Sequence, residues 1–113
     1  MSTVTIGVSS FDDVMRRTSA AFQGKPQSEH ISFASVELLW KTLTPRRWAL
    51  IRAMAGKGPM SIRAAGRLIG HDIKTIHGDV QALLEAGVVE KDDADQVVFP
   101  YDAIHVDFMI KAA

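Results

Sequence analysis

The chain has 113 residues, 47% of them apolar, and its 13 basic and 13 acidic residues cancel to a net charge of zero. This is enough apolar material for one domain but not for a second independent core. Cysteine is absent, which excludes disulfides and thiolate metal sites. No apolar run approaches the roughly 20 residues of a membrane-spanning helix. Residues 1–8 lack the features of a signal peptide, so we expect a soluble, cytoplasmic protein.

The first 43 residues predict a strand, a helix and a second strand. Residues 3–8 form a β-branched run typical of a strand. Ser10 and Asp13 then mark the start of a helix over about residues 11–22. The polar residues 25–29 indicate a linker, and a candidate strand follows at residues 31–34. Because this part is too small to fold alone, we interpret residues 1–43 as an N-terminal extension for dimerisation or partner binding.

Three short helices are predicted next, each with its own start signal. Thr44 followed by Pro45 starts a helix that runs to about Ala55, Ser61 caps residues 62–69, and Asp72 caps residues 73–86. Glycines 56, 70 and 87 end them. Helical spacing predicts their buried faces: Trp48, Ile51, the Arg52 stem and Ala55; Ile62, Ala65, Leu68 and Ile69; and Ile76, Val80, Leu83 and Leu84.

The remaining chain reads as β structure. Residues 87–91 and 96–100 predict a hairpin whose tip, residues 92–95, is acidic. Residues 103–111 alternate apolar and polar side chains, which predicts a further strand with residues 3–8 as its candidate neighbour. We therefore divide the chain into the extension, a unit of three helices and a hairpin over residues 44–100, and a C-terminal strand over residues 101–113 that contributes to a dimer interface.

The zero net charge conceals two oppositely charged stretches. From Lys41 to Lys74 the chain has a net charge of +7, since eight basic residues face only Asp72; from Glu85 to Asp107 seven acids face only Lys91, for a net charge of −6. Clustered positive charge is typical of surfaces that neutralise phosphates. It coincides here with the three helices.

Three helices and a hairpin, in this order, are the arrangement of a winged helix-turn-helix, whose third helix enters the major groove of DNA. Residues 61–91, SIRAAGRLIGHDIKTIHGDVQALLEAGVVEK, resemble the MarR-like and ArsR-like winged-helix regulators of bacteria and archaea. The segments LTPRRWALIRAM and FPYDAIHVDF look like a family of small prokaryotic regulators associated with toxin-antitoxin operons. The expected fold class is α+β, mainly helical.

The resemblance implies that Ile76 is buried and that the opposite face of the third helix reads DNA bases. That face comprises Ile73, Lys74, His77, Gly78 and Gln81. Lysine, histidine and glutamine can hydrogen-bond base edges, and isoleucine can touch a thymine methyl group. Gly78 departs from the family pattern, because a long polar residue is common at that position. It lowers helix propensity and removes a contact unless the backbone approaches DNA closely.

A second set of residues is expected to bind the DNA backbone, because hydroxyls, guanidinium groups and free N–H groups at helix starts commonly meet phosphates. The set comprises Thr44, Arg46, Arg47, Ser61, Arg63, Arg67, His71 and Thr75. The acidic hairpin tip differs from the family expectation, since wings are usually basic. We predict that this tip stands off DNA.

Other functions find less support in the residues. No two histidines have the i, i+4 spacing of a helical metal site, and His105 with Asp107 supplies only two ligands. No phosphate-binding glycine loop or carboxylate pair indicates an enzyme, so no cofactor is expected.

Two hypotheses for the function remain. One is a homodimeric, sequence-specific regulator of double-stranded DNA, such as a repressor or autoregulating antitoxin. The alternative is a protein-interaction module that neutralises a partner such as a toxin.

Overall fold

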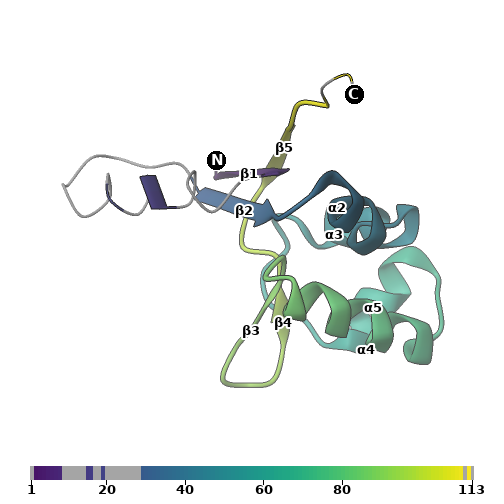
Figure 1. The fold of residues 1–113 in the computed structure, drawn as a ribbon. Helices are drawn as coiled ribbons and strands as arrows, with labels where there is room; N and C mark the ends of the chain where they lie inside the picture. Colours follow the sequence, from purple (N-terminus) through teal and green to yellow (C-terminus); the bar gives the residue numbers. More distant parts are fainter. Residues whose placement is uncertain (1, 9–14, 17–18, 20–28, 111, 113) are drawn as a thin grey trace.

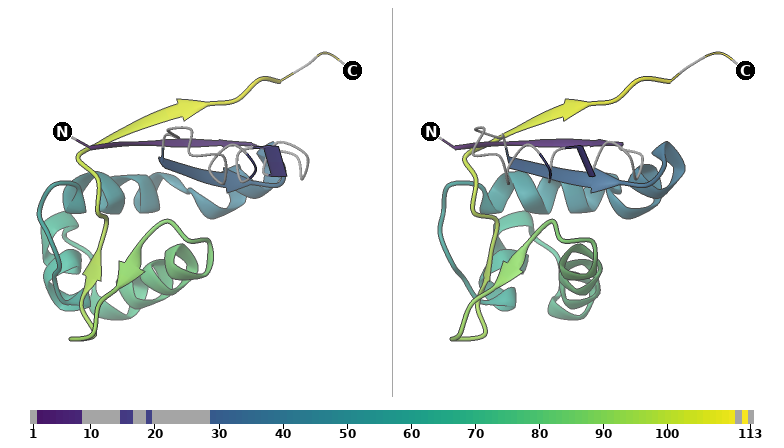
Figure 2. Two further views of the ribbon diagram at one scale, coloured as in Figure 1. Left: turned by 90° about the vertical axis from the view of Figure 1, so that its left-hand side faces the viewer. Right: turned by 60° about the vertical axis from the view of Figure 1, so that its left-hand side comes forward.

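The structure, a computed structural model, describes residues 2–8, 15–16, 19, 29–110 and 112 and has an α+β fold built in layers (Figure 1). One layer is a sheet, the next holds two helices, and two further helices lie with a hairpin on the far side (Figure 2). The described elements are β1 Thr3–Val8, β2 Glu29–Phe33, α2 Val36–Thr42, α3 Pro45–Met54, α4 Ile62–Ile69, α5 Ile73–Glu85, β3 Glu90–Lys91, β4 Val97–Val98 and β5 Ala103–Asp107.

The sheet brings the two ends of the chain together. Its strand order is β2-β1-β5, and both pairings are parallel. This confirms that the C-terminal strand lies beside residues 3–8, with Ile6 paired to Val106. Gly7 is needed in this pairing, because a Cβ at that position would collide with the main-chain carbonyl oxygen of Asp107.

Four predicted strands have wrong boundaries. The C-terminal strand ends at Asp107 rather than residue 111, because β1, its partner, ends one residue after the Gly7–Asp107 pair. The second strand is Glu29–Phe33 rather than residues 31–34, so it takes in the last residue of the predicted linker. The hairpin strands are Glu90–Lys91 and Val97–Val98, shorter than the predicted residues 87–91 and 96–100. The helix predicted over residues 11–22 lies outside the described residues except at positions 15, 16 and 19.

The three predicted helix starts are confirmed. The side-chain oxygens of Thr44, Ser61 and Asp72 accept hydrogen bonds from backbone N–H groups three residues further on, at Arg47, Ala64 and Thr75. Each bond satisfies one of the N–H groups that a helix start leaves unpaired. A further helix, α2, begins in the same way at Ser35.

Two predicted buried faces need correction. In α3 the fully buried residues are Leu50, Ile51 and Met54, whereas the predicted Trp48 and Ala55 are only partly buried against the core and Arg52 is exposed. In α4 Leu68 is exposed, while Ala65 and Gly66 are buried. Both helices carry apolar side chains around more than one face, so spacing alone does not fix which face packs inward.

One core joins the sheet to the helices. Val4, Ile6, Ile31 and Phe33 from the strands belong to the same buried cluster as Leu50 and Ile76 from the helices. The N-terminal strands and the predicted DNA-binding unit therefore do not pack as separate bodies. In the part of the chain that the structure describes, no helix is long and apolar enough to cross a membrane.

Candidate nucleic-acid interface

The five predicted base-reading residues share one exposed face of α5. Ile73, Lys74, His77, Gly78 and Gln81 are all exposed, and Ile73 has 44% of its surface accessible. On the opposite face Ile76, Val80 and Leu83 are buried. A Cβ added at Gly78 would meet nothing within 4 Å, so the space beside this position of the helix is open. The helix therefore presents lysine, histidine and glutamine side chains to solvent together.

A tight turn sets α5 against α4. Gly70 ends α4 in the left-handed conformation, with φ of 72°, and the N–H of His71 donates to the carbonyl oxygen of Gly66 at 3.1 Å. Gly66 itself is buried, and a Cβ there would lie 3.1 Å from the carbonyl oxygen of His71 and 3.3 Å from Ile76 Cγ1. The close approach of the two helices depends on this glycine, although nothing in the local sequence distinguishes Gly66 from an ordinary helical residue.

The start of α5 is fixed by Asp72. One of its carboxylate oxygens accepts from the N–H of Thr75 at 2.9 Å, and the other accepts from the Thr75 hydroxyl at 3.0 Å. These hydrogen bonds, the backbone one first, lower the pKa of Asp72. The hydroxyl proton of Thr75, a predicted phosphate donor, is thus directed at Asp72.

Two other predicted phosphate ligands form an ion-pair cluster around a buried aspartate. Asp79, on α5, is 1% exposed. It accepts from Arg46 Nε at 2.6 Å and Arg46 Nη2 at 2.8 Å, and from Arg47 Nε at 3.1 Å. Arg47 also donates to the carbonyl oxygen of Thr42 at 2.9 Å. The cluster ties the start of α3 to the middle of α5.

The cluster keeps Asp79 ionised in spite of its burial. Burial by itself raises the pKa of Asp79, but the hydrogen bonds and charges of Arg46 and Arg47 outweigh it, and the net pKa is lowered. The same pairing raises the pKa of Arg46. This role of Arg46 and Arg47 cannot be predicted from their sequence context, because nothing local links them to an aspartate more than 30 positions away.

The remaining predicted backbone ligands fall into two groups. Arg63, Arg67 and His71 are exposed, and within the described residues neither arginine forms an ion pair. Lys74, on the exposed face of α5, is likewise exposed and forms no ion pair with a described residue. Thr44 and Ser61 already accept hydrogen bonds as helix caps, although each hydroxyl proton stays available to an external acceptor.

The hairpin is braced against the start of α4. Met60 and Val97 exchange two backbone hydrogen bonds, of 2.9 and 2.8 Å, which places Met60 beside β4 of the β3–β4 pair.

Two of the three acids at the hairpin tip form contacts within the hairpin. Asp92 accepts from the N–H groups of Ala94 and Gln96, and Asp95 pairs with Lys91 Nζ at 3.1 Å. Asp93 is exposed and makes neither kind of contact with a described residue.

Comparison with known proteins gives one match. A family model, HVO_A0114, matches residues 42–106, which is more than half of the chain and includes α3, α4, α5, the hairpin and most of β5. No curated protein and no solved structure matches the sequence. Because the family model covers more than half of the chain, the chain belongs to the HVO_A0114 family.

Proposed function

We propose that this protein is a sequence-specific, double-stranded DNA-binding transcriptional regulator, in which α3, α4, α5 and the hairpin act as a winged helix-turn-helix. The observation that carries the proposal is the exposed face of α5, where Lys74, His77 and Gln81 stand together on a helix whose other face is buried. An isolated helix of this kind fits the major groove, and these side chains can hydrogen-bond base edges.

The arrangement around α5 supports the same function. α4 packs against α5 through Gly66, as the bracing helix of a helix-turn-helix does, and the single β-bridge from Met60 to Val97 anchors the hairpin beside the start of α4. Arg63 and Arg67 on α4 supply positive charge that no ion pair with a described residue neutralises. In this proposal they bind phosphates and fix the register, while α5 reads the bases.

Arg46 and Arg47 have a different part in the proposal. Their guanidinium groups are committed to Asp79, so they hold α5 in position and contribute less net charge toward DNA than their number indicates. The phosphate-binding set is therefore centred on Arg63, Arg67 and Lys74. A repressor is the simplest form of such a regulator, since DNA occupancy alone can block transcription.

The test is a titration of the purified protein against a fluorescent duplex from its own upstream region and against a scrambled duplex. We expect the upstream duplex to bind more tightly, with Lys74→Ala/His77→Ala lowering that affinity by roughly tenfold or more, since each good base contact discriminates by about 1–3 kcal/mol. Lys57→Ala/His30→Ala removes one lysine and one histidine at exposed positions outside α5 and is the matched control. Equal binding of both duplexes, or equal losses in the two double variants, would reject base reading by α5.

A further inference from the structure

The free edge of the sheet is the strongest unused feature of the molecule. β5 pairs with β1 on one side, and on its other side no described strand is hydrogen-bonded to it. Proteins commonly protect such edges with lysine, proline or a bulge. Residues 103–110 contain no lysine and no proline. This edge therefore has the properties of a pairing site rather than of a protected one.

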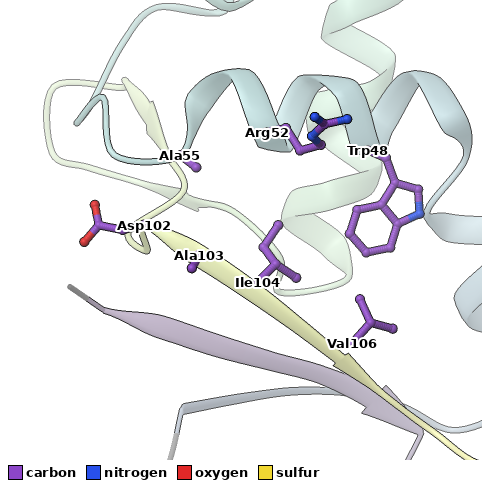
Figure 3. A pocket seen from close by; sticks show the side chains of 7 residues that line it. All are labelled: Trp48, Arg52, Ala55, Asp102, Ala103, Ile104 and Val106. Carbon is purple, nitrogen blue, oxygen red and sulfur yellow. The ribbon is translucent and has the colours of Figure 1, made fainter.

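Apolar surface gathers beside this edge. A groove of about 410 Å³ lies between α3 and β5, lined by Trp48, Arg52, Ala55 and residues 102–104 and 106. Ile104 and Val106 point from β5 toward α3, where the Trp48 ring lies (Figure 3). Further along, Phe108 meets the edge of Trp40 at 5.9 Å between ring centroids. Trp40, Val106, Met109 and Ile110 are 56%, 43%, 77% and 70% exposed.

The sequence of β5 is complementary to itself. If two copies of the strand run antiparallel with Val106 at the centre, Ile104 lies opposite the partner's Phe108, and His105 lies opposite the partner's Asp107. The first pair is apolar and faces the helices. The second can form a hydrogen bond or an ion pair on the other face, and it occurs twice across the two-fold axis. Shifting the register by one residue would break this matching of faces and charges.

We propose that the occupant of this edge is a second copy of the chain, joined by antiparallel pairing of β5 with β5 about Val106. The two sheets then form one continuous six-stranded sheet, and the partner's Phe108 and Ile110 lie beside Ile104 along the groove. This pairing supplies the two-fold axis that the proposed regulator needs to bind paired half-sites. The dimer proposal rests on the proposed function only through this need for a two-fold axis. Its test contains no DNA, so the two can fail separately.

The absence of cysteine makes the register directly testable. In this pairing the two Val106 Cα atoms lie about 4.5–5.5 Å apart, which is within the range of a disulfide. We expect Val106→Cys to give a disulfide-linked dimer under mild oxidation in the otherwise native full-length protein. The Ile104 Cα atoms of the two protomers lie four residue positions apart along the paired strands, a distance of roughly 13 Å. Ile104→Cys should therefore remain monomeric on non-reducing gels. Leu38→Cys is a second control with the same 43% exposure as Val106.

The charge pairing is tested by sedimentation of uncrosslinked protein. Wild-type protein should sediment as a dimer. His105→Asp places two acids opposite each other and should weaken association at least severalfold, and adding Asp107→His restores an opposite pair and should recover it. Circular dichroism and thermal unfolding of each variant show whether the fold is retained, and His105→Asp changes only an exposed side chain.

Several outcomes would overturn the proposal. Wild-type protein that sediments as a monomer at all concentrations excludes the dimer. A dimer in which Val106→Cys crosslinks no better than Leu38→Cys uses another surface. Crosslinking of Ile104→Cys as efficient as that of Val106→Cys rejects the register. If the chain alone stays monomeric and a different protein binds at this edge, the occupant of the edge is that protein and not a second copy of the chain.

Discussion

Asp79 is the residue whose environment departs most from its sequence context. It is a carboxylate on α5, almost fully buried and held by two arginines of α3. Losing one member of a buried ion pair leaves the other charges without a partner. Because the Arg46 side chain keeps 41% exposure, water can compensate part of that loss. The main effect of the cluster is therefore to fix the position of α5, and the net attraction between its charges is the smaller effect.

We expect Asp79→Ala to lower the free energy of unfolding by about 3 kcal/mol, at the low end of the range for breaking a buried pair. Urea unfolding near neutral pH measures the change. Asp93→Ala is the matched control, since Asp93 is an exposed aspartate without a described partner, and it should change stability by less than about 0.5 kcal/mol.

Acid titration provides a second readout of the same substitution. The folded pKa of Asp79 lies below its unfolded value, so its stabilising contribution is complete above the unfolded pKa of about 3.9 and is lost as the pH falls through the folded pKa. The stabilities of wild type and Asp79→Ala should therefore converge as the pH is lowered below about 4. A gap that stays constant through this range would mean that packing, and not ionisation, is what the substitution removes.

At the level of elements, the helix starts and stops could be predicted from sequence because their signals are local. Thr44, Ser61 and Asp72 each bond an N–H group three residues away, and α4 has the predicted bounds. The full burial of Leu50 and Met54, with Trp48 only partly buried, could not be predicted, because it depends on the strands that share the core with α3. The Asp79 cluster and the Gly7 contact join distant positions, for which one sequence holds no local sign.

The hairpin tip is the element whose charge opposes the proposed function. Of its three acids, Asp92 holds the turn and Asp95 pairs with Lys91, so only Asp93 can be changed without disturbing the hairpin. We predict that Asp93→Lys tightens DNA binding by about two- to tenfold at low salt, because it replaces a repulsive charge near the phosphates by an attractive one. The gain should disappear at high salt, where a tip standing off the DNA is screened.

Titration of wild type and Asp93→Lys at two salt concentrations measures this effect, with Glu37→Lys on α2 as a control for the same change in net charge. Glu37 is exposed and lies outside the hairpin. If Asp93→Lys weakens binding at low salt while Glu37→Lys does not, the tip carboxylate makes a favourable contact with DNA and the predicted stand-off is wrong.

Across the whole molecule, the fold separates the two functions that the chain is proposed to combine. The sheet with its free edge forms one layer, and α4, α5 and the hairpin lie on the opposite side of α3 (Figure 2). Arg63, Arg67 and Lys74, which form no ion pair with a described residue, belong to this second side, while the edge carries apolar residues and the His105–Asp107 pattern. A dimer formed through β5 would leave α5 of each protomer uncovered by the sheet layer.

This separation predicts how salt dependence changes with assembly. Three phosphate contacts per protomer give a slope of log affinity against log salt of about −2.7 for a single protomer and about −5 for a dimer. Val106→Glu places two like charges at the centre of the proposed pairing and should produce monomers, so its slope should fall to roughly half the wild-type value while its fold is retained. Leu38→Glu, at an equally exposed position, should keep the full slope. Anisotropy titrations over a series of salt concentrations measure both slopes. A monomeric Val106→Glu protein with an unchanged slope would show that one protomer makes all the phosphate contacts, and the dimer would then have no part in DNA binding.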